Sequence, residues 1–143
     1  MFRVDSTIPT YYNVDVDFVA GEALTAGDVA MLDATQTGAA RQHVVKQCTA
    51  VALGNARACG IIQKTVASGE IVPVRVCGVA LNVNAATPVA GNPLVVVATA
   101  GRVEVNVAAN IGPILGVALE DAAGNVLPSM LVADPLGLAS LAR

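Results

Sequence analysis

The feature of this sequence that most restricts its fold is a glycine that recurs between a small residue and a polar one. It occurs at residues 20–22, 26–28, 68–70, 90–92, 100–102 and 123–125. Glycine adopts the backbone angles of tight turns at little cost, so each copy predicts a turn. The segments between these turns are rich in valine and lack long stretches of helical periodicity. The sequence therefore predicts many short strands and an all-β fold.

Two segments carry the strand pattern most clearly. Residues 102–107 alternate polar and apolar side chains, which predicts a strand with one buried and one exposed face. Residues 71–76 form a second candidate, but Pro73 has no backbone N–H to donate. We therefore expect this second strand at a sheet edge or at a bulge.

The two halves of the chain can be aligned with each other in three blocks that keep their order. Residues 23–32 match 87–96, residues 59–63 match 115–119, and residues 68–76 match 123–131, with offsets of 64, 56 and 55 residues. We therefore predict a short-strand β-barrel or β-tulip-like domain over residues 19–133, with an internal two-fold repeat of halves near residues 20–78 and 84–132. Chance similarity in a chain rich in alanine, valine and glycine is the alternative.

Aromatic residues are confined to the N-terminal end of the chain. Phe2, Tyr11, Tyr12 and Phe18 are the only four, and aromatic side chains dominate the energetics of protein interfaces. We therefore predict an extended arm over residues 1–18 that binds a neighbouring subunit. The alternative is that this segment closes its own barrel as a terminal strand. At the other end, residues 134–143 are expected to form a short apolar tail.

Two carboxylates in the predicted arm, Asp15 and Asp17, are spaced so that an extended backbone places both on one side. There they can meet a basic partner or a cation, or they can form a solvated acidic edge. We assign them to partner binding together with the four aromatic residues, and we expect no metal site.

The composition favours assembly with other proteins. The chain is 55% hydrophobic and only 13% charged, so much of its surface consists of small and apolar residues. Such a surface suits burial against partners, and we expect a homo-oligomer or a larger assembly. The eight lysine and arginine residues form no basic stripe, so nucleic-acid binding is not expected. No apolar run reaches the length of a membrane span or forms a secretion signal, so we expect neither.

The sequence offers few residues for catalysis. Cys48, Cys59 and Cys77 are an odd number with no paired spacing, which argues against disulfides and zinc and predicts buried, reduced thiols in a reducing cytoplasm. His43 is the only histidine, and its pairing with Cys59 or Cys77 in a cysteine-dependent enzyme is an alternative. The common nucleotide, hydrolase, metalloprotease and calcium motifs do not occur. We expect no enzymatic activity and no cofactor.

The repeated blocks resemble a known family. Residues 116–125, residues 59–62 with 67–79, and the turn at residues 26–28 are similar to the small capsid decoration, or cement, proteins of tailed phages. The similarity spans roughly residues 20–133, but its motifs are turn-and-strand patterns of low information. It implies a β-barrel or tulip-like fold, no enzymatic activity, and binding to the outside of the major capsid protein lattice, often as homotrimers. The protein would then be part of the virion and assemble in the host cytoplasm.

Two departures limit this resemblance. The aromatic N-terminal segment lies outside the shared pattern, and residues 124–129 replace a strand that is usually charged. Neither the role of the arm nor the oligomeric state therefore follows from the family. The competing interpretation is a non-catalytic β-barrel binding module for carbohydrate or another partner, although repeats without aromatic residues argue against sugar stacking.

Overall fold

The computed structural model describes residues 13–49, 58–96, 100–106 and 114–133, and this part of the chain is all-β, as predicted. One short 3-10 helix, η1 (Gly38–Gln42), follows the second strand, and no helix in these ranges is long and apolar enough to cross a membrane. The strands are β1 (Val14–Ala20), β2 (Val29–Leu32), β3 (Val44–Gln47), β4 (Ala58–Ile62), β5 (Ile71–Asn84), β6 (Pro93–Val96), β7 (Val103–Val105), β8 (Gly116–Ala118) and β9 (Val126–Ala133).

The first five strands close into a barrel. Their order is β1-β3-β2-β4-β5, and β5 pairs back with β1, which closes the ring. The pairing of β1 with β3 is parallel and the others are antiparallel. A closed barrel leaves no free sheet edge over the paired residues, so the backbone groups of these short strands are satisfied within the chain.

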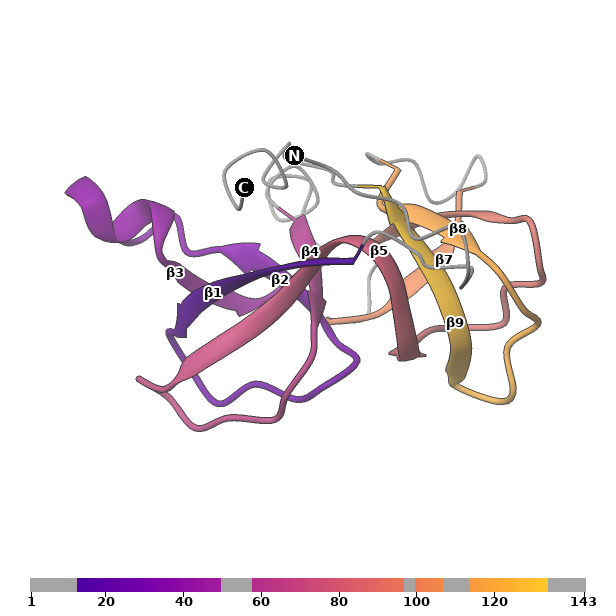
Figure 1. Cartoon of the computed structure of the whole chain (residues 1–143), viewed down its shortest axis with the longest axis horizontal. Coiled ribbons are helices and arrows are strands. Elements are labelled where there is room, and N and C mark those ends of the chain that lie inside the picture. The colour runs from indigo at the N-terminus through magenta and orange to yellow at the C-terminus, as the bar shows by residue number, and fades with distance from the viewer. Residues whose placement is uncertain (1–12, 50–57, 97–99, 107–113, 134–143) are drawn as a thin grey trace, which may run out of the picture.

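Strand β5 is long and curved, and its second half belongs to a second set of strands (Figure 1). Here the order is β5-β9-β8-β6-β7, and Ala85, just after β5, forms a parallel bridge with Val103 of β7. We call this set the second barrel. Its pairings follow the same order as those of the first barrel, with one parallel contact between its first and third segments. The strand pairings recur in the two barrels, but they do not test the internal repeat that was predicted from the amino-acid sequence.

Individual hydrogen bonds recur in the two barrels at corresponding places. Gly27 N donates to Ile62 O at 2.8 Å in the first barrel, and Gly91 N donates to Ala118 O at 2.8 Å in the second. Gly27 and Gly91 both have positive φ, 92° and 88°. Each lies in the tight turn that leads into the second strand of its barrel, where glycine adopts such angles at little cost. The two turns therefore hold the same position relative to the fourth strand.

The core consists of two clusters of buried aliphatic side chains that meet at β4. One cluster fills the first barrel, with Phe18 as its largest aromatic member, and the other fills the second barrel. Cys59 and Ile62 of β4 face the first cluster, whereas Ala58 and Ile61 pack into the second. All five residues of β4 are therefore buried, because this strand has an apolar cluster on each of its two faces.

A buried carboxylate ties the barrels together where they meet. Asp28 accepts hydrogen bonds from Gln47 Nε2 at 2.7 Å and from Asn84 Nδ2 at 2.9 Å. Beside it, Gly101 of the second barrel accepts from Val29 N and donates to Cys48 O, both in the first barrel. A side chain at Gly101 would lie 2.9 Å from Asp28 Cγ, so this junction requires glycine.

The prediction that Pro73 puts its strand at a sheet edge or at a bulge is wrong. Strand β5 is paired on both edges, with β1 opposite Pro73 and β4 on the other side, and the register shift of the β1 ladder falls between Val14 and Asp15 instead. The ladder with β4 ends at Val74, the residue after Pro73, so no partner needs the missing N–H. The Pro73 carbonyl still accepts a hydrogen bond from Gln63 N at 2.9 Å.

We predict that alanine at Gly60 or Gly116 strongly destabilises the fold. A Cβ at Gly60 would overlap with the Arg75 carbonyl oxygen, and a Cβ at Gly116 would overlap with the Leu131 carbonyl oxygen. Because backbone atoms on a paired strand cannot move aside, each change should lower the free energy of unfolding in urea by about 3 kcal/mol.

The matched control is Gly69→Ala, where a Cβ meets nothing within 4 Å but φ is +86°. This control isolates the cost of the left-handed backbone, about 1 kcal/mol. If Gly60→Ala were no more destabilising than Gly69→Ala, the close backbone approach would not be a constraint on the fold.

Candidate docking surface

Each barrel has an outer sheet face built from corresponding strands, and the two faces differ in chemistry. In the first barrel, Asp15 lies opposite Arg75 and Asp17 lies opposite Pro73. The second barrel has Val79 opposite Leu131 at the corresponding pair. The correspondence follows from the glycine contacts, because the backbone of Arg75 abuts Gly60 as that of Leu131 abuts Gly116.

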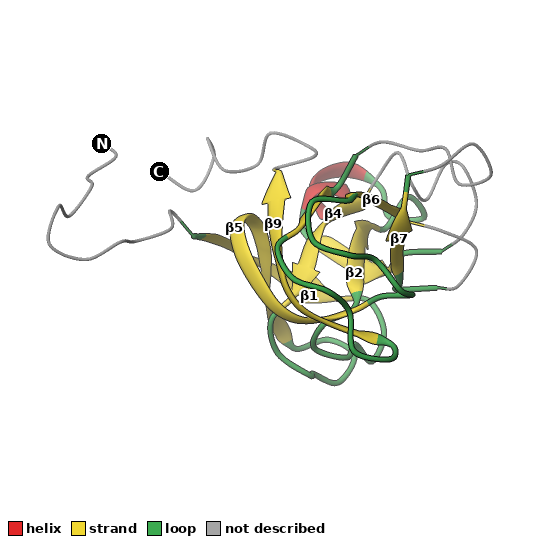
Figure 2. Ribbon diagram, turned by 90° about the vertical axis from the view of Figure 1, so that its right-hand side faces the viewer, coloured by secondary structure: helices red, strands yellow, loops and turns green. Residues whose placement is uncertain are grey.

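The outer face of the second barrel is aliphatic. Val79 of β5, Leu131 of β9 and Val117 of β8 form one row across three strands, because Leu131 is paired with both valines. Leu81 and Leu119 form the next row on either side of Ser129, since Leu81 pairs with Ser129 and Leu119 N donates to Ser129 O at 3.1 Å. We call these five aliphatic residues the aliphatic face. Figure 2 shows β5 and β9 curving side by side, as their register requires.

Several side chains of the aliphatic face are open to solvent. Leu81 is 62% exposed, Leu131 40% and Leu119 39%, while Val79 and Val117 are half-buried. The neighbouring polar side chain is already satisfied, since Ser129 Oγ donates to Glu120 Oε2 at 2.6 Å. Contiguous exposed aliphatic residues with satisfied polar neighbours are typical of a protein-binding surface rather than of a catalytic one.

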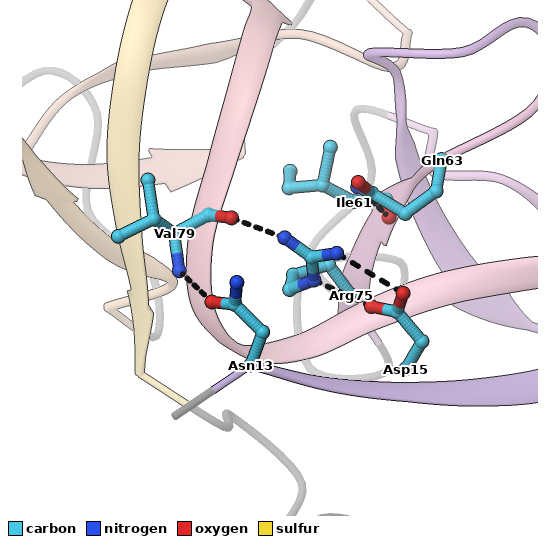
Figure 3. A network of polar contacts seen from close by, with 6 residues as sticks. All are labelled: Asn13, Asp15, Ile61, Gln63, Arg75 and Val79. Carbon is cyan, nitrogen blue, oxygen red and sulfur yellow. Dashed lines mark hydrogen bonds and ion pairs between the residues drawn. The ribbon is translucent and has the colours of Figure 1, made fainter. Parts of the chain in front are cut away.

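The corresponding face of the first barrel carries a polar network around Arg75 (Figure 3). Arg75 Nε donates to Asp15 Oδ1 at 2.5 Å and Nη2 donates to Asp15 Oδ2 at 3.0 Å, which makes a two-pronged ion pair. Arg75 also donates to the Val79 carbonyl, and Asn13 Oδ1 accepts from Val79 N at 2.8 Å. The network therefore holds the start of β1 against β5 at the point where β5 passes from one barrel to the other.

The residues predicted to bind a partner are separated by the structure. Phe18 is 3% exposed and packs inside the first barrel, so its side chain is not available to a partner. Asp15 is engaged by Arg75, and Asp17 is exposed on the same strand. Phe2, Tyr11 and Tyr12 lie outside the described residues.

Residues 14–20 are strand β1, which closes the first barrel. For this part of the predicted arm, the alternative of a barrel-closing strand is therefore the observed structure. The aliphatic face was missed by sequence reasoning, because its residues come from three separate segments. Its only signal in the sequence is Leu81, an apolar residue at a position where the alternation of β5 points outward.

The cysteine residues and His43 lie in contrasting environments. Cys59 is fully buried and its Sγ donates to Ala30 O at 3.4 Å. Burial, with a smaller effect of the nearby Cys48, raises the pKa of the Cys59 thiol to about 12, so it stays protonated at neutral pH. His43 is exposed beside η1, and Cys77 is half-buried on β5. In the described part of the chain, no three His, Cys, Asp or Glu side chains form a cluster that could hold a metal ion.

A buried carboxylate at Asp33 has a structural role. Its burial acts to raise the pKa, but hydrogen bonds from Gln36 and Thr35 and the nearby Lys46 outweigh this effect, so the pKa lies well below its ordinary value. Thr35 N and Oγ1 donate to Oδ1 at 3.0 and 2.7 Å, and Gln36 Nε2 donates to Oδ2 at 2.9 Å. These bonds close the turn after β2 and leave the carboxylate no free side for a ligand.

Comparisons with known proteins add no relative to this picture. The sequence matches no protein-family model and no curated protein.

We predict different effects of neutralising the two aspartates of β1. Asp15→Asn leaves the largely buried Arg75 without its ion-pair partner, and should lower the free energy of unfolding by about 1 kcal/mol. Asp17→Asn is the matched control on the same strand and face, and should change stability by less than about 0.5 kcal/mol. Equal effects of the two substitutions in urea unfolding would show that the ion pair does not hold β1 to β5.

Proposed function

We propose that this chain is a non-enzymatic structural protein of a tailed-phage virion, which binds the outside of the major capsid protein lattice and stabilises the head. It assembles in the host cytoplasm and acts as a homo-oligomer, for which we propose a trimer. Its partners are the major capsid protein and other copies of itself.

The observation that carries this proposal is the aliphatic face. Leu81, Leu119 and Leu131 are exposed on a rigid sheet at positions where the first barrel carries charged or polar side chains. A sheet of paired strands holds these side chains at fixed spacing, so little side-chain freedom is lost on docking. The low charged fraction of the chain, 13%, supports the same function, because few charges must be desolvated at a contact.

Repetition of the contact explains how a small surface can suffice. Three exposed leucines bury less area than a stable isolated complex usually needs. On a capsid lattice many copies bind side by side, and linked contacts in an oligomer act together with a high effective concentration. Modest contacts per copy therefore add up to a stable shell.

A carbohydrate-binding module is the competing function, and it is less well supported. Sugar binding typically uses aromatic side chains that line a concave site. In the described ranges the only aromatic side chain is Phe18, which is buried in the core of the first barrel. The aliphatic face offers neither aromatic stacking nor unsatisfied polar groups.

We predict that the purified full chain co-sediments with empty shells assembled from the major capsid protein of the same genome. Deletion of residues 1–12 should weaken this binding at least about tenfold, since aromatic anchors contribute most to interface energy. The deletion has to stop before β1, which begins at Val14 and closes the first barrel.

The β-rich circular dichroism of the deletion variant should be unchanged, and Ile71→Asp provides a control at an exposed apolar residue at the other end of β5 from Leu81. Absence of any binding to shells would contradict the proposed function. Unchanged binding after the deletion would contradict only the role of the N-terminal segment.

A further inference from the structure

We propose that residues 1–12 of the same chain lie across the aliphatic face of the second barrel and cover it in the free protein. This proposal concerns the free chain; on the shell the segment would leave the face, so that both the face and the aromatic residues of the segment contact the lattice. Its starting point is the exposure of Leu81, Leu119 and Leu131, because soluble proteins seldom leave contiguous aliphatic side chains uncovered.

The N-terminal segment joins the described part of the chain at the border of this face. Asn13, the first described residue, accepts a hydrogen bond through its Oδ1 from Val79 N at 2.8 Å, and Val79 belongs to the aliphatic face. The Arg75 side chain, which donates to the Val79 carbonyl and pairs with Asp15, fixes the same place from the other side (Figure 3). Asn13, to which the segment is joined, is therefore held next to the surface that the segment is proposed to cover.

The direction of the chain favours the N-terminal segment over the C-terminal one. Followed from Val19 back to Val14, β1 runs along β5 from Ile71 to Cys77. Asn13 comes next and is bonded to Val79, so at this point the chain is directed toward Leu81. Strand β9 runs the opposite way, so that at its end, Ala133 opposite Cys77, the described chain is directed away from Leu81. The direction of the described strands therefore favours the N-terminal end as the occupant of the aliphatic face.

The composition of the segment fits the chemistry of the face. Residues 1–12 hold Phe2, Ile8, Tyr11 and Tyr12 and only two charged side chains, Arg3 and Asp5. The aliphatic face has no aromatic and no charged member, so aromatic rings can cover it without desolvating an ion. The corresponding face of the first barrel carries Asp15, Asp17 and Arg75, which makes it a poor receptor for the same segment.

Length and attachment favour the same copy over a neighbour. Twelve extended residues span up to about 40 Å, whereas the face from β5 across β9 to β8 is about 10 Å wide. A segment attached at the border of its site has an effective concentration in the millimolar range, which a separate copy reaches only in a lattice.

The experiment uses the intrinsic tyrosine fluorescence of the full chain. Tyr11 and Tyr12 are the only tyrosines and the chain has no tryptophan, so all of this emission comes from the segment. We expect acrylamide to quench the emission at least about threefold less efficiently than that of a free peptide of residues 1–12, because rings packed on a protein surface are shielded.

Two substitutions put the residues of the first barrel at the corresponding positions of the second. Leu81→Asp and Leu131→Arg reproduce Asp17 and Arg75, and both native side chains are exposed, so the variants should fold. Each should raise the quenching constant toward that of the peptide, with unchanged far-ultraviolet circular dichroism. The matched control is Ile71→Asp, since Ile71 is 58% exposed but lies at the start of β5, opposite Val19 of the first barrel, and its quenching should equal that of the native chain.

The outcomes separate the possible occupants. Quenching in the native chain that equals that of the peptide would overturn the proposal, as would shielding that persists in both face variants. Shielding that disappears on dilution would also overturn it and would identify the occupant as the segment of a neighbouring copy. Shielding that is independent of concentration and is lost in the face variants is the result that the proposal requires.

Discussion

The architecture depends on one shared strand, β5, which supplies a wall to each of two barrels. Its first half pairs with β1 and β4, and its second half pairs with β9. Within each barrel the fourth strand can approach its neighbour closely because glycine stands where strand backbones touch, at Gly60 against Arg75 and at Gly116 against Leu131. A side chain at either glycine would push β4 away from β5 or β8 away from β9.

A common scaffold therefore presents two faces of opposite character. In the first barrel the outer positions hold an ion pair that fixes the start of β1, whereas in the second barrel they hold exposed leucines. The polar face serves the fold, since its groups bond to each other and to the backbone. The aliphatic face leaves three leucines exposed, and this difference points to binding of another segment or partner as its role.

The sequence predicted the all-β class and most of the turns. Five of the six predicted turn glycines have positive φ, and the exception is Gly21, which lies in the bend just after β1. Local patterns could not reveal that Pro73 lies on a doubly paired strand, since this depends on where the β4 ladder ends. The strand pairings also equate Pro73 with Ser129, one residue from the Pro128 of the sequence alignment. The aliphatic face was equally hidden, because a register between distant strands assembles it.

The most direct test of this account is carbene footprinting of the full chain, read by mass spectrometry residue by residue. Ile71 and Val89 are 58% and 52% exposed and lie outside the aliphatic face, so they serve as internal references for Leu81, which is 62% exposed. If the aliphatic face is a contact surface, Leu81 and Leu131 are labelled much less than these references in the free chain and on the shell. Labelling in proportion to exposure in both states would contradict the account.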